Sequence, residues 1–162
     1  MERDNRTIVS NLVMDSIRVL IVISKFKYRK TFKLTIDKIM LYDFIMKFPN
    51  TILENNNIET LQDIDFFEYY SYYHWKPNQS EYLKILNYLI SKRLIVRRLE
   101  ENKFFYLSTS EGKDLINLLE SSYKHKLDKV ATIIKEEISK LSDTTIENKI
   151  MEKVSIQNRF RG

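Results

Sequence analysis

The sequence predicts a mainly α-helical fold with one small β-hairpin, organised as a winged helix-turn-helix with a C-terminal helical extension. The chain has only two Gly and two Pro in 162 residues, as expected for helices with short connections. Between Pro77 and Gly112 a helical pattern precedes two short β-rich runs, which is the order of a recognition helix and its wing. Beyond these, apolar residues recur at helical spacing among Lys and Glu. We therefore expect a winged-helix domain with N-terminal helices over 1–122 and an amphipathic helical extension over 123–162.

Two helices are expected ahead of the winged segment. The apolar positions of residues 8–24 fit an amphipathic helix that becomes apolar nearly all round at 19–23, so this part should be buried. The second helix should run from Thr35, a suitable N-terminal cap, to Phe48, because a proline follows. Residues 58–73 are acidic and are also expected to be helical.

The winged segment begins with a helix over 78–93, followed by strands at 95–98 and 104–107 around a polar turn. A further helix follows the wing, and two starts are open: a capping box of Ser108 with Glu111, or Thr109 as the cap. The residues expected to face inward from these two helices are Tyr82, Leu83, Leu86, Leu89, Ile90, the stem of Arg93, Leu115, Leu118 and Leu119.

Several functional classes lack their sequence signals. The chain has no cysteine, its two histidines lie far apart, and the HExxH, GxGxxG, GxxxxGK[ST] and GxSxG motifs are all missing. We therefore expect no enzyme activity, no metal and no cofactor. The longest apolar run, 19–23, is too short to cross a bilayer, and the N-terminus does not have the form of a secretory signal. We expect a cytoplasmic protein with no membrane partner.

The first candidate for nucleic-acid contact is the segment 25–33, where five basic residues alternate with three aromatic ones. Cations neutralise phosphates and rings stack on bases, so this strip could follow a nucleic-acid backbone. The alternative is a solvated connection whose aromatic side chains pack inward. The outward face of the helix 78–93 is nearly balanced in charge, which argues against sequence-specific reading of DNA. The candidate DNA-contact residues are Lys25, Lys27, Arg29, Lys30, Lys33, Lys84, Arg97, Arg98 and Lys103.

Two other features indicate a protein partner. Residues 66–75 contain seven aromatic residues in ten positions, more than one helix face can bury, and aromatic side chains are enriched at interface centres. The apolar stripe of the C-terminal extension is narrow, and such a stripe is stable mainly when it is covered. The candidate partner-contact residues are Phe67, Tyr70, Tyr73, Trp75, Leu127, Val130, Ile134, Ile138 and Leu141.

The segment YYSYYHWKPNQSEYLKILNYLISKRLIVRR, with LTIDKIMLYDFIMKFP upstream, resembles the small middle component of bacterial ABC-three-component systems, the group that includes Lamassu anti-phage defence. The resemblance covers about residues 13–119. In such systems a small winged-helix protein accompanies an SMC-like ATPase and an effector, often a nuclease. The resemblance implies an adaptor without catalytic residues that bridges the ATPase and the effector nuclease, with double-stranded DNA reached through the complex.

Two hypotheses for function therefore remain open. An adaptor subunit is favoured by the neutral helix face, the surplus of aromatic residues and the C-terminal stripe. A stand-alone winged-helix transcriptional regulator that dimerises through its C-terminal helices is favoured by the basic strip and the wing arginines. The net charge of +5 permits contact with nucleic acid and does not demand it.

Overall fold

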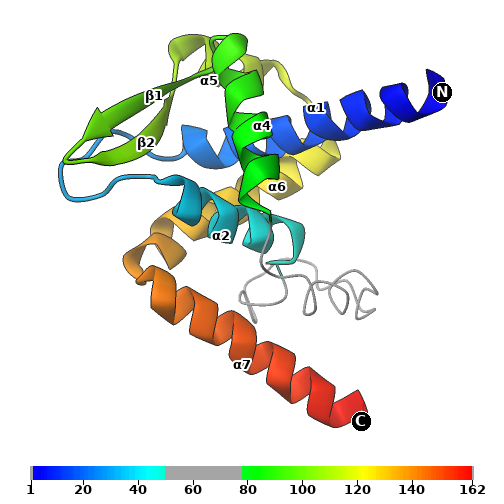
Figure 1. The fold of residues 1–162 in the computed structure, drawn as a ribbon, viewed down its shortest axis with the longest axis vertical. Coiled ribbons are helices and arrows are strands. Elements are labelled where there is room, and N and C mark those ends of the chain that lie inside the picture. The colour runs from blue at the N-terminus through cyan, green and yellow to red at the C-terminus, as the bar shows by residue number, and fades with distance from the viewer. Residues whose placement is uncertain (1, 50–77, 162) are drawn as a thin grey trace.

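A computed structural model describes residues 2–49 and 78–161, and the side chains of 11–49 and 78–152. It confirms the predicted fold class, since the described chain is mainly helical with one antiparallel hairpin and a C-terminal helix (Figure 1). The predicted helix at 58–73 lies outside the described residues. In chain order the elements are α1 (Glu2–Ser24), α2 (Ile36–Lys47), α4 (Gln79–Ser91), β1 (Ile95–Glu100), β2 (Lys103–Ser108), α5 (Ser110–Leu118), α6 (Ser122–Glu136), the short 3-10 helix η2 (Ile138–Lys140) and α7 (Asp143–Arg161).

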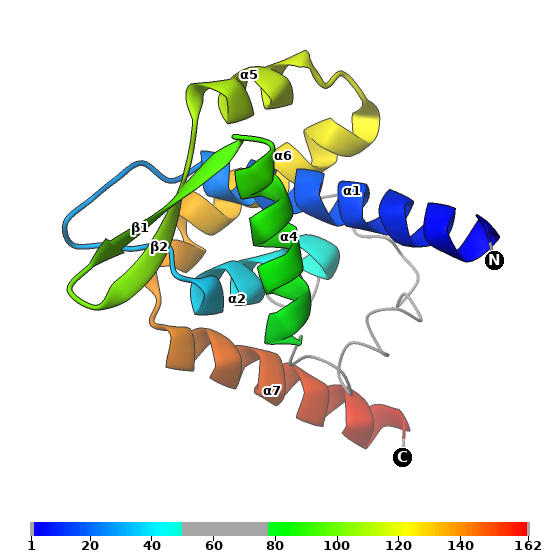
Figure 2. The same ribbon diagram turned by 45° about the horizontal axis from the view of Figure 1, so that its top comes forward.

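Helix α1 is the centre of the fold. It contacts α2, α4, α5, α6 and β2, and Figure 2 shows these elements arranged around its C-terminal half. The five residues from Val19 to Ile23 are 0–1% exposed, so the predicted burial of this all-apolar run is confirmed. An all-apolar helix surface can be stable only when neighbours cover every side of it, and here four helices and a strand do so.

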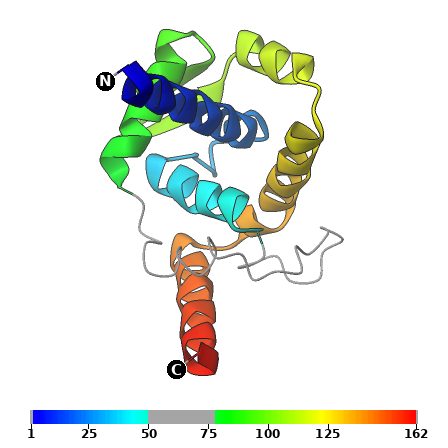
Figure 3. The same ribbon diagram turned by 90° about the vertical axis from the view of Figure 1, so that its right-hand side faces the viewer.

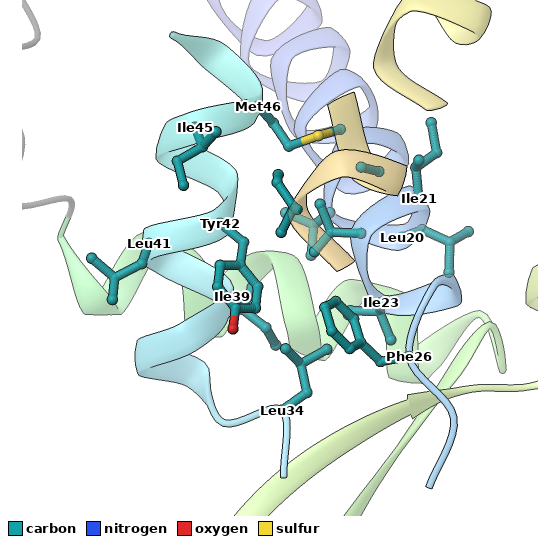
Figure 4. Packing of buried hydrophobic residues seen from close by; sticks show 14 of the residues in the cluster. Leu20, Ile21, Ile23, Phe26, Leu34, Ile39, Leu41, Tyr42, Ile45 and Met46 are labelled. Atoms are coloured by element: carbon teal, nitrogen blue, oxygen red, sulfur yellow. The ribbon is translucent and has the colours of Figure 1, made fainter. Parts of the chain in front are cut away.

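Helix α2 packs across α1 and begins where its sequence predicts. The Thr35 hydroxyl accepts a hydrogen bond from the Lys38 backbone N–H at 3.4 Å, which confirms Thr35 as the cap. Figure 4 shows Ile39, Tyr42 and Met46 on the side of α2 that faces α1, whereas Leu41 and Ile45 point to its other side. All five side chains belong to the hydrophobic core.

A buried ion pair with a third partner joins α1, α2 and α4. Asp43 is fully buried and accepts hydrogen bonds from Arg18 Nε at 2.5 Å and Nη2 at 2.9 Å. The Tyr82 hydroxyl donates to the same carboxylate at 2.5 Å. Burial, followed by the charge of Asp43, raises the pKa of Tyr82 above its usual range. The carboxylate thus receives three hydrogen bonds from two helices, which is how a buried charge is tolerated.

Helix α4 is capped by Asn78, whose side chain accepts from the Ser80 backbone N–H at 3.0 Å. Tyr82, Ile85, Leu86 and Leu89 are buried, but Leu83 is 41% exposed, so its predicted inward position is wrong. Leu83 follows Tyr82 by about 100° around the helix and lies beyond the side that α1 and α2 cover.

The end of α4 differs from the sequence prediction in one further residue. Arg93 follows the helix with a φ of 60°, the left-handed conformation in which many helices end, and its side chain is exposed. Its stem therefore does not continue the inward face of α4.

The predicted hairpin is confirmed. Strands β1 and β2 pair antiparallel from Ile95 opposite Ser108 to Glu100 opposite Lys103. The two turn residues, Glu101 and Asn102, have φ values of 51° and 61°, as in the two-residue turns that match the twist of a hairpin.

The start of α5 is set by Thr109 and Gly112. The Thr109 hydroxyl accepts from the Gly112 backbone N–H at 3.0 Å, so of the two open starts Thr109 is the cap. A Cβ atom on residue 112 would lie 2.2 Å from the Leu94 carbonyl oxygen, so only glycine allows this close approach. Leu118 ends the helix 78% exposed, because the chain turns there toward the Ser121 cap of α6, and its predicted inward position is wrong.

The apolar stripe of the C-terminal extension lies in the core of this same chain. Helix α6 packs against α1 and α2, and its stripe belongs to the same hydrophobic cluster as theirs. These side chains lack the exposure that a partner contact needs, because they already pack in or against the hydrophobic core of the chain. The structure therefore assigns to the core the buried residues Leu127, Val130, Ile134 and Ile138 and places Leu141, which is half-buried, against the same cluster.

The C-terminal extension is broken at residues 142–143, where the sequence Ser-Asp is typical of a helix break or a new cap. The Ser142 hydroxyl accepts from the Thr145 backbone N–H at 3.1 Å, and α7 begins there. Ile146 and Ile150 are fully buried and α7 contacts α2, while the C-terminal part of α7 projects from the rest of the molecule (Figure 3).

Two buried tyrosines should lower the stability of the fold at alkaline pH. Burial raises the pKa of Tyr42 above its usual range, as it does the pKa of Tyr82. In the unfolded chain a tyrosine loses its proton near pH 10, so above that pH the folded state binds more protons and becomes less stable. We expect each of the two tyrosines to lower the free energy of unfolding by about 1.4 kcal/mol per pH unit above pH ~10.

The substitution Tyr42→Phe isolates one of these contributions. The Tyr42 hydroxyl is buried and has no hydrogen-bond partner among the described residues. Its removal should leave stability at neutral pH equal or higher by about 1 kcal/mol, since no hydrogen bond is lost. Urea unfolding at neutral and alkaline pH should show a smaller loss of stability at alkaline pH, because one tyrosine proton fewer distinguishes the folded from the unfolded state. If the free energy of unfolding falls with alkaline pH as steeply in the variant as in the parent, the raised pKa of Tyr42 is contradicted.

Candidate nucleic-acid interface

The loop between α1 and α2 contains the basic strip, and its aromatic side chains are all engaged within the chain. Phe26 stacks on Tyr42 of α2 with ring centroids 5.6 Å apart, and Phe32 stacks on Phe26 at 5.2 Å. Tyr28 packs against Phe105 of the wing at 6.0 Å, and its hydroxyl donates to the Glu100 carboxylate at 3.0 Å. Phe26 and Phe32 are therefore packed against other rings of the chain, as expected for inward-packed aromatic side chains, whereas Tyr28 is 47% exposed.

Folding pairs two of the five strip cations with acids that the sequence places far away. Lys25 Nζ lies 2.7 Å from Oδ1 of Asp128 on α6, and Lys33 Nζ lies 3.4 Å from Oε2 of Glu101 in the wing turn. The other three strip cations are exposed and form no ion pair within the described parts of the chain: Lys27, Arg29 and Lys30.

Lys27 and Arg29 border a hollow of about 600 Å³ between the loop and the end of α6. Lys135 of α6 and Lys140 of η2 line the opposite side. We call this site the basic hollow. Four cations and one acid give it a net charge of +3, and its lining residues are Phe26, Lys27, Arg29, Phe32, Lys135, Glu136, Ser139 and Lys140.

A second hollow, of about 680 Å³, lies on the wing side of the same loop and is almost neutral. Its four lysines face three acids, a net charge of +1, and two of those lysines form ion pairs with Glu101 at 3.4 Å and Asp143 at 2.6 Å. The unbalanced positive charge is therefore greater on the α6 side. The charged residues of the second hollow are Lys30, Lys33, Asp37, Lys38, Glu101, Lys103 and Asp143.

The remaining predicted DNA-contact residues are dispersed. Lys84 is exposed on α4 and lines neither hollow. On the wing, Arg97 lies over the Phe104 ring at 4.8 Å, Arg98 is exposed, and Lys103 is opposite Glu100 in the strand register. The structure thus brings together the loop cations with Lys135 and Lys140, which sequence reasoning did not identify.

The surfaces available to a protein partner also differ from the predicted ones. The aromatic candidates Phe67, Tyr70, Tyr73 and Trp75 lie outside the described residues. Within the described part, Leu99 and Phe104 face each other across the hairpin tip and are 61% and 51% exposed. Their sequence signal is weak, because isolated apolar residues beside a turn are common.

The ranges 2–49 and 78–161 contain neither a cluster of metal-ligating side chains nor a membrane-spanning helix. No group of three or more His, Asp or Glu side chains is placed there to hold an ion. None of the helices described is both long enough and apolar enough for a membrane span.

One protein-family model matches the chain over residues 11–158, and it is described as ABC-three component (ABC-3C) system Middle Component 2. The match covers most of the chain and includes the core, the hairpin and most of α7. Comparisons with curated proteins and with solved structures gave no match. The similarity to a middle component, seen first in the residues around α2 and α4, is thereby confirmed, and the chain belongs to the Middle Component 2 family of ABC-three component systems.

Proposed function

We propose that this chain is a non-catalytic adaptor that bridges the SMC-like ATPase and the effector nuclease of a Lamassu-type anti-phage defence complex. Membership of a three-component system implies partner components. The observation that carries the proposal is the outward face of α4, where Glu81 and Lys84 balance each other and Leu83 is exposed. A helix that reads duplex DNA presents cations and amides to it, whereas a neutral face with an exposed apolar residue suits a protein contact.

The hairpin tip supports the same function. Leu99 and Phe104 form an exposed apolar pair, and charged residues surround it on both strands. An apolar centre with a polar rim is the usual composition of a protein interface. The stand-alone regulator is less well supported, because α6, one of the helices through which it would dimerise, is already packed into the core.

The first test of the proposal removes this apolar pair. We expect Leu99→Asp with Phe104→Asp to reduce co-purification of the ATPase or the effector at least about tenfold, which corresponds to about 1.4 kcal/mol. Both residues are exposed, so the melting temperature should hardly change. Leu118→Asp is the matched control, since Leu118 is even more exposed and lies on α5. Full assembly with the double variant would show that the hairpin tip is not an interface.

Contact with DNA is a second candidate function, favoured by the three unpaired loop cations Lys27, Arg29 and Lys30. Cations on an exposed loop bind phosphates and carry no sequence information. We therefore expect weak binding of duplex DNA without sequence preference, and more in the assembled complex than in the free chain.

A further inference from the structure

The geometry points to a phosphate-binding site in the basic hollow, completed by Lys135 and Lys140, that takes the backbone of duplex DNA. This inference deepens the DNA contact of the proposed function and rests on it, while the adaptor role does not depend on it.

The two sides of the hollow are held in fixed positions by contacts between the loop and the core. Phe26 stacks between Phe32 and Tyr42, which holds the loop against α2. The ion pair of Lys25 with Asp128, at 2.7 Å, ties the start of the loop to α6. The loop cations therefore project from an anchored backbone and face the end of α6.

The opposite side is formed by the last turn of α6 and by η2. Lys135 and Lys140 are exposed, and neither forms an ion pair with the described residues. The Ser139 hydroxyl donates to the Lys135 carbonyl oxygen, which places Ser139 and Lys140 just beyond the helix end. Among the described residues of the lining Glu136 is the only acid, so three of the four positive charges remain unbalanced.

The spread of charge favours a polymer over a small anion. The cations do not converge on one point; they border the hollow from two sides and continue along the loop to Lys30, which lines the neighbouring hollow. A row of cations fits successive phosphates of a backbone. The two aromatic rings that line the hollow, Phe26 and Phe32, stack on each other, and Phe26 also stacks on Tyr42, so the hollow offers no free ring for stacking on single-stranded bases. These features together favour the duplex backbone.

The test uses the full chain and a fluorescent duplex of random sequence, titrated at several salt concentrations. Each phosphate contact contributes about 0.9 to the slope of log affinity against log salt. We expect Lys135→Gln with Lys140→Gln to lower this slope by about 1.8, and Lys27→Gln with Arg29→Gln to lower it similarly. The matched control is Lys126→Gln with Lys129→Gln, which removes the same charge from exposed positions of α6 outside the hollow. An equal loss in the control would show a general effect of net charge and would overturn the site.

Two further measurements separate the possible ligands and the two roles. Displacement of the duplex by tripolyphosphate or by single-stranded DNA at equal phosphate concentration would overturn the assignment to duplex backbone. Failure of the parent chain to bind the duplex, alone and in the assembled complex, would overturn the site itself. Co-purification of the ATPase and the effector should be the same for the parent and the Lys135, Lys140 variant. Loss of DNA binding with intact assembly therefore leaves the adaptor role standing.

Discussion

Asp43→Ala should lower the free energy of unfolding by about 3–5 kcal/mol, the largest effect that we expect from one substitution. The carboxylate is fully buried and accepts hydrogen bonds from both Arg18 and Tyr82. Its removal leaves the Arg18 charge largely buried, with Asp15 at 2.9 Å as its remaining partner. Urea unfolding followed by circular dichroism measures the loss.

Two control variants distinguish a buried charge from a general effect of the substitution. Asp37→Ala, at an exposed position of the same helix, should cost less than about 1 kcal/mol, since it loses only a favourable position in the first helical turn. Arg18→Met combined with Asp43→Leu should be less destabilising than Asp43→Ala alone, because no uncompensated charge remains. If the double variant is the less stable of the two, the ion pair itself stabilises the fold.

Ile134→Ala should lower the free energy of unfolding by about 2–5 kcal/mol, because it opens a cavity where α6 packs on α1 and α2. If the apolar stripe of α6 faced a partner, the substitution would hardly change the free energy of unfolding of the isolated chain. The matched control is Leu118→Ala, which removes an exposed apolar side chain and should stay within about 0.5 kcal/mol. Equal stability of the parent and the Ile134→Ala chain would contradict the packing of α6 described above.

Features set by local sequence were predictable. The Thr35 cap, the break at Ser142 and the hairpin turn each depend on residues within a few positions of one another. The burial of Val19–Ile23 was also predictable, because a helix that is apolar all round must be covered. In each of these places the local preference and the final structure agree.

Features set by contacts between distant segments were not predictable. The stripe that contains Ile134 and Ile138 was expected to meet a partner, but its pattern shows only that something covers it, and the hydrophobic core of the same chain does so. The apolar residues Leu83 and Leu118 fit the helical spacing but lie at the edge or end of a packed face. The apolar pattern of a helix gives the direction of its buried face, and one residue at the edge hardly changes that direction. The sequence therefore could not show where the buried face ends.

The candidate DNA site shows the same division. The loop cations were visible in the sequence, but their pairing with acids was not, since Asp128 is far from Lys25 along the chain. In the sequence Lys135 and Lys140 have the spacing of ordinary solvent-exposed lysines of an amphipathic helix. Only the fold shows that they lie beside the loop. Only the tertiary structure separates the cations that are neutralised from those that remain unpaired.

The most direct measurement of the adaptor role is the composition of the complex formed with and without this chain. The ATPase and the effector of the same system are co-expressed, and their association is measured by size-exclusion chromatography with light scattering. We expect one assembly of all three components when this chain is present and no association of the ATPase with the effector when it is omitted. Full association of those two components without this chain would contradict the adaptor function.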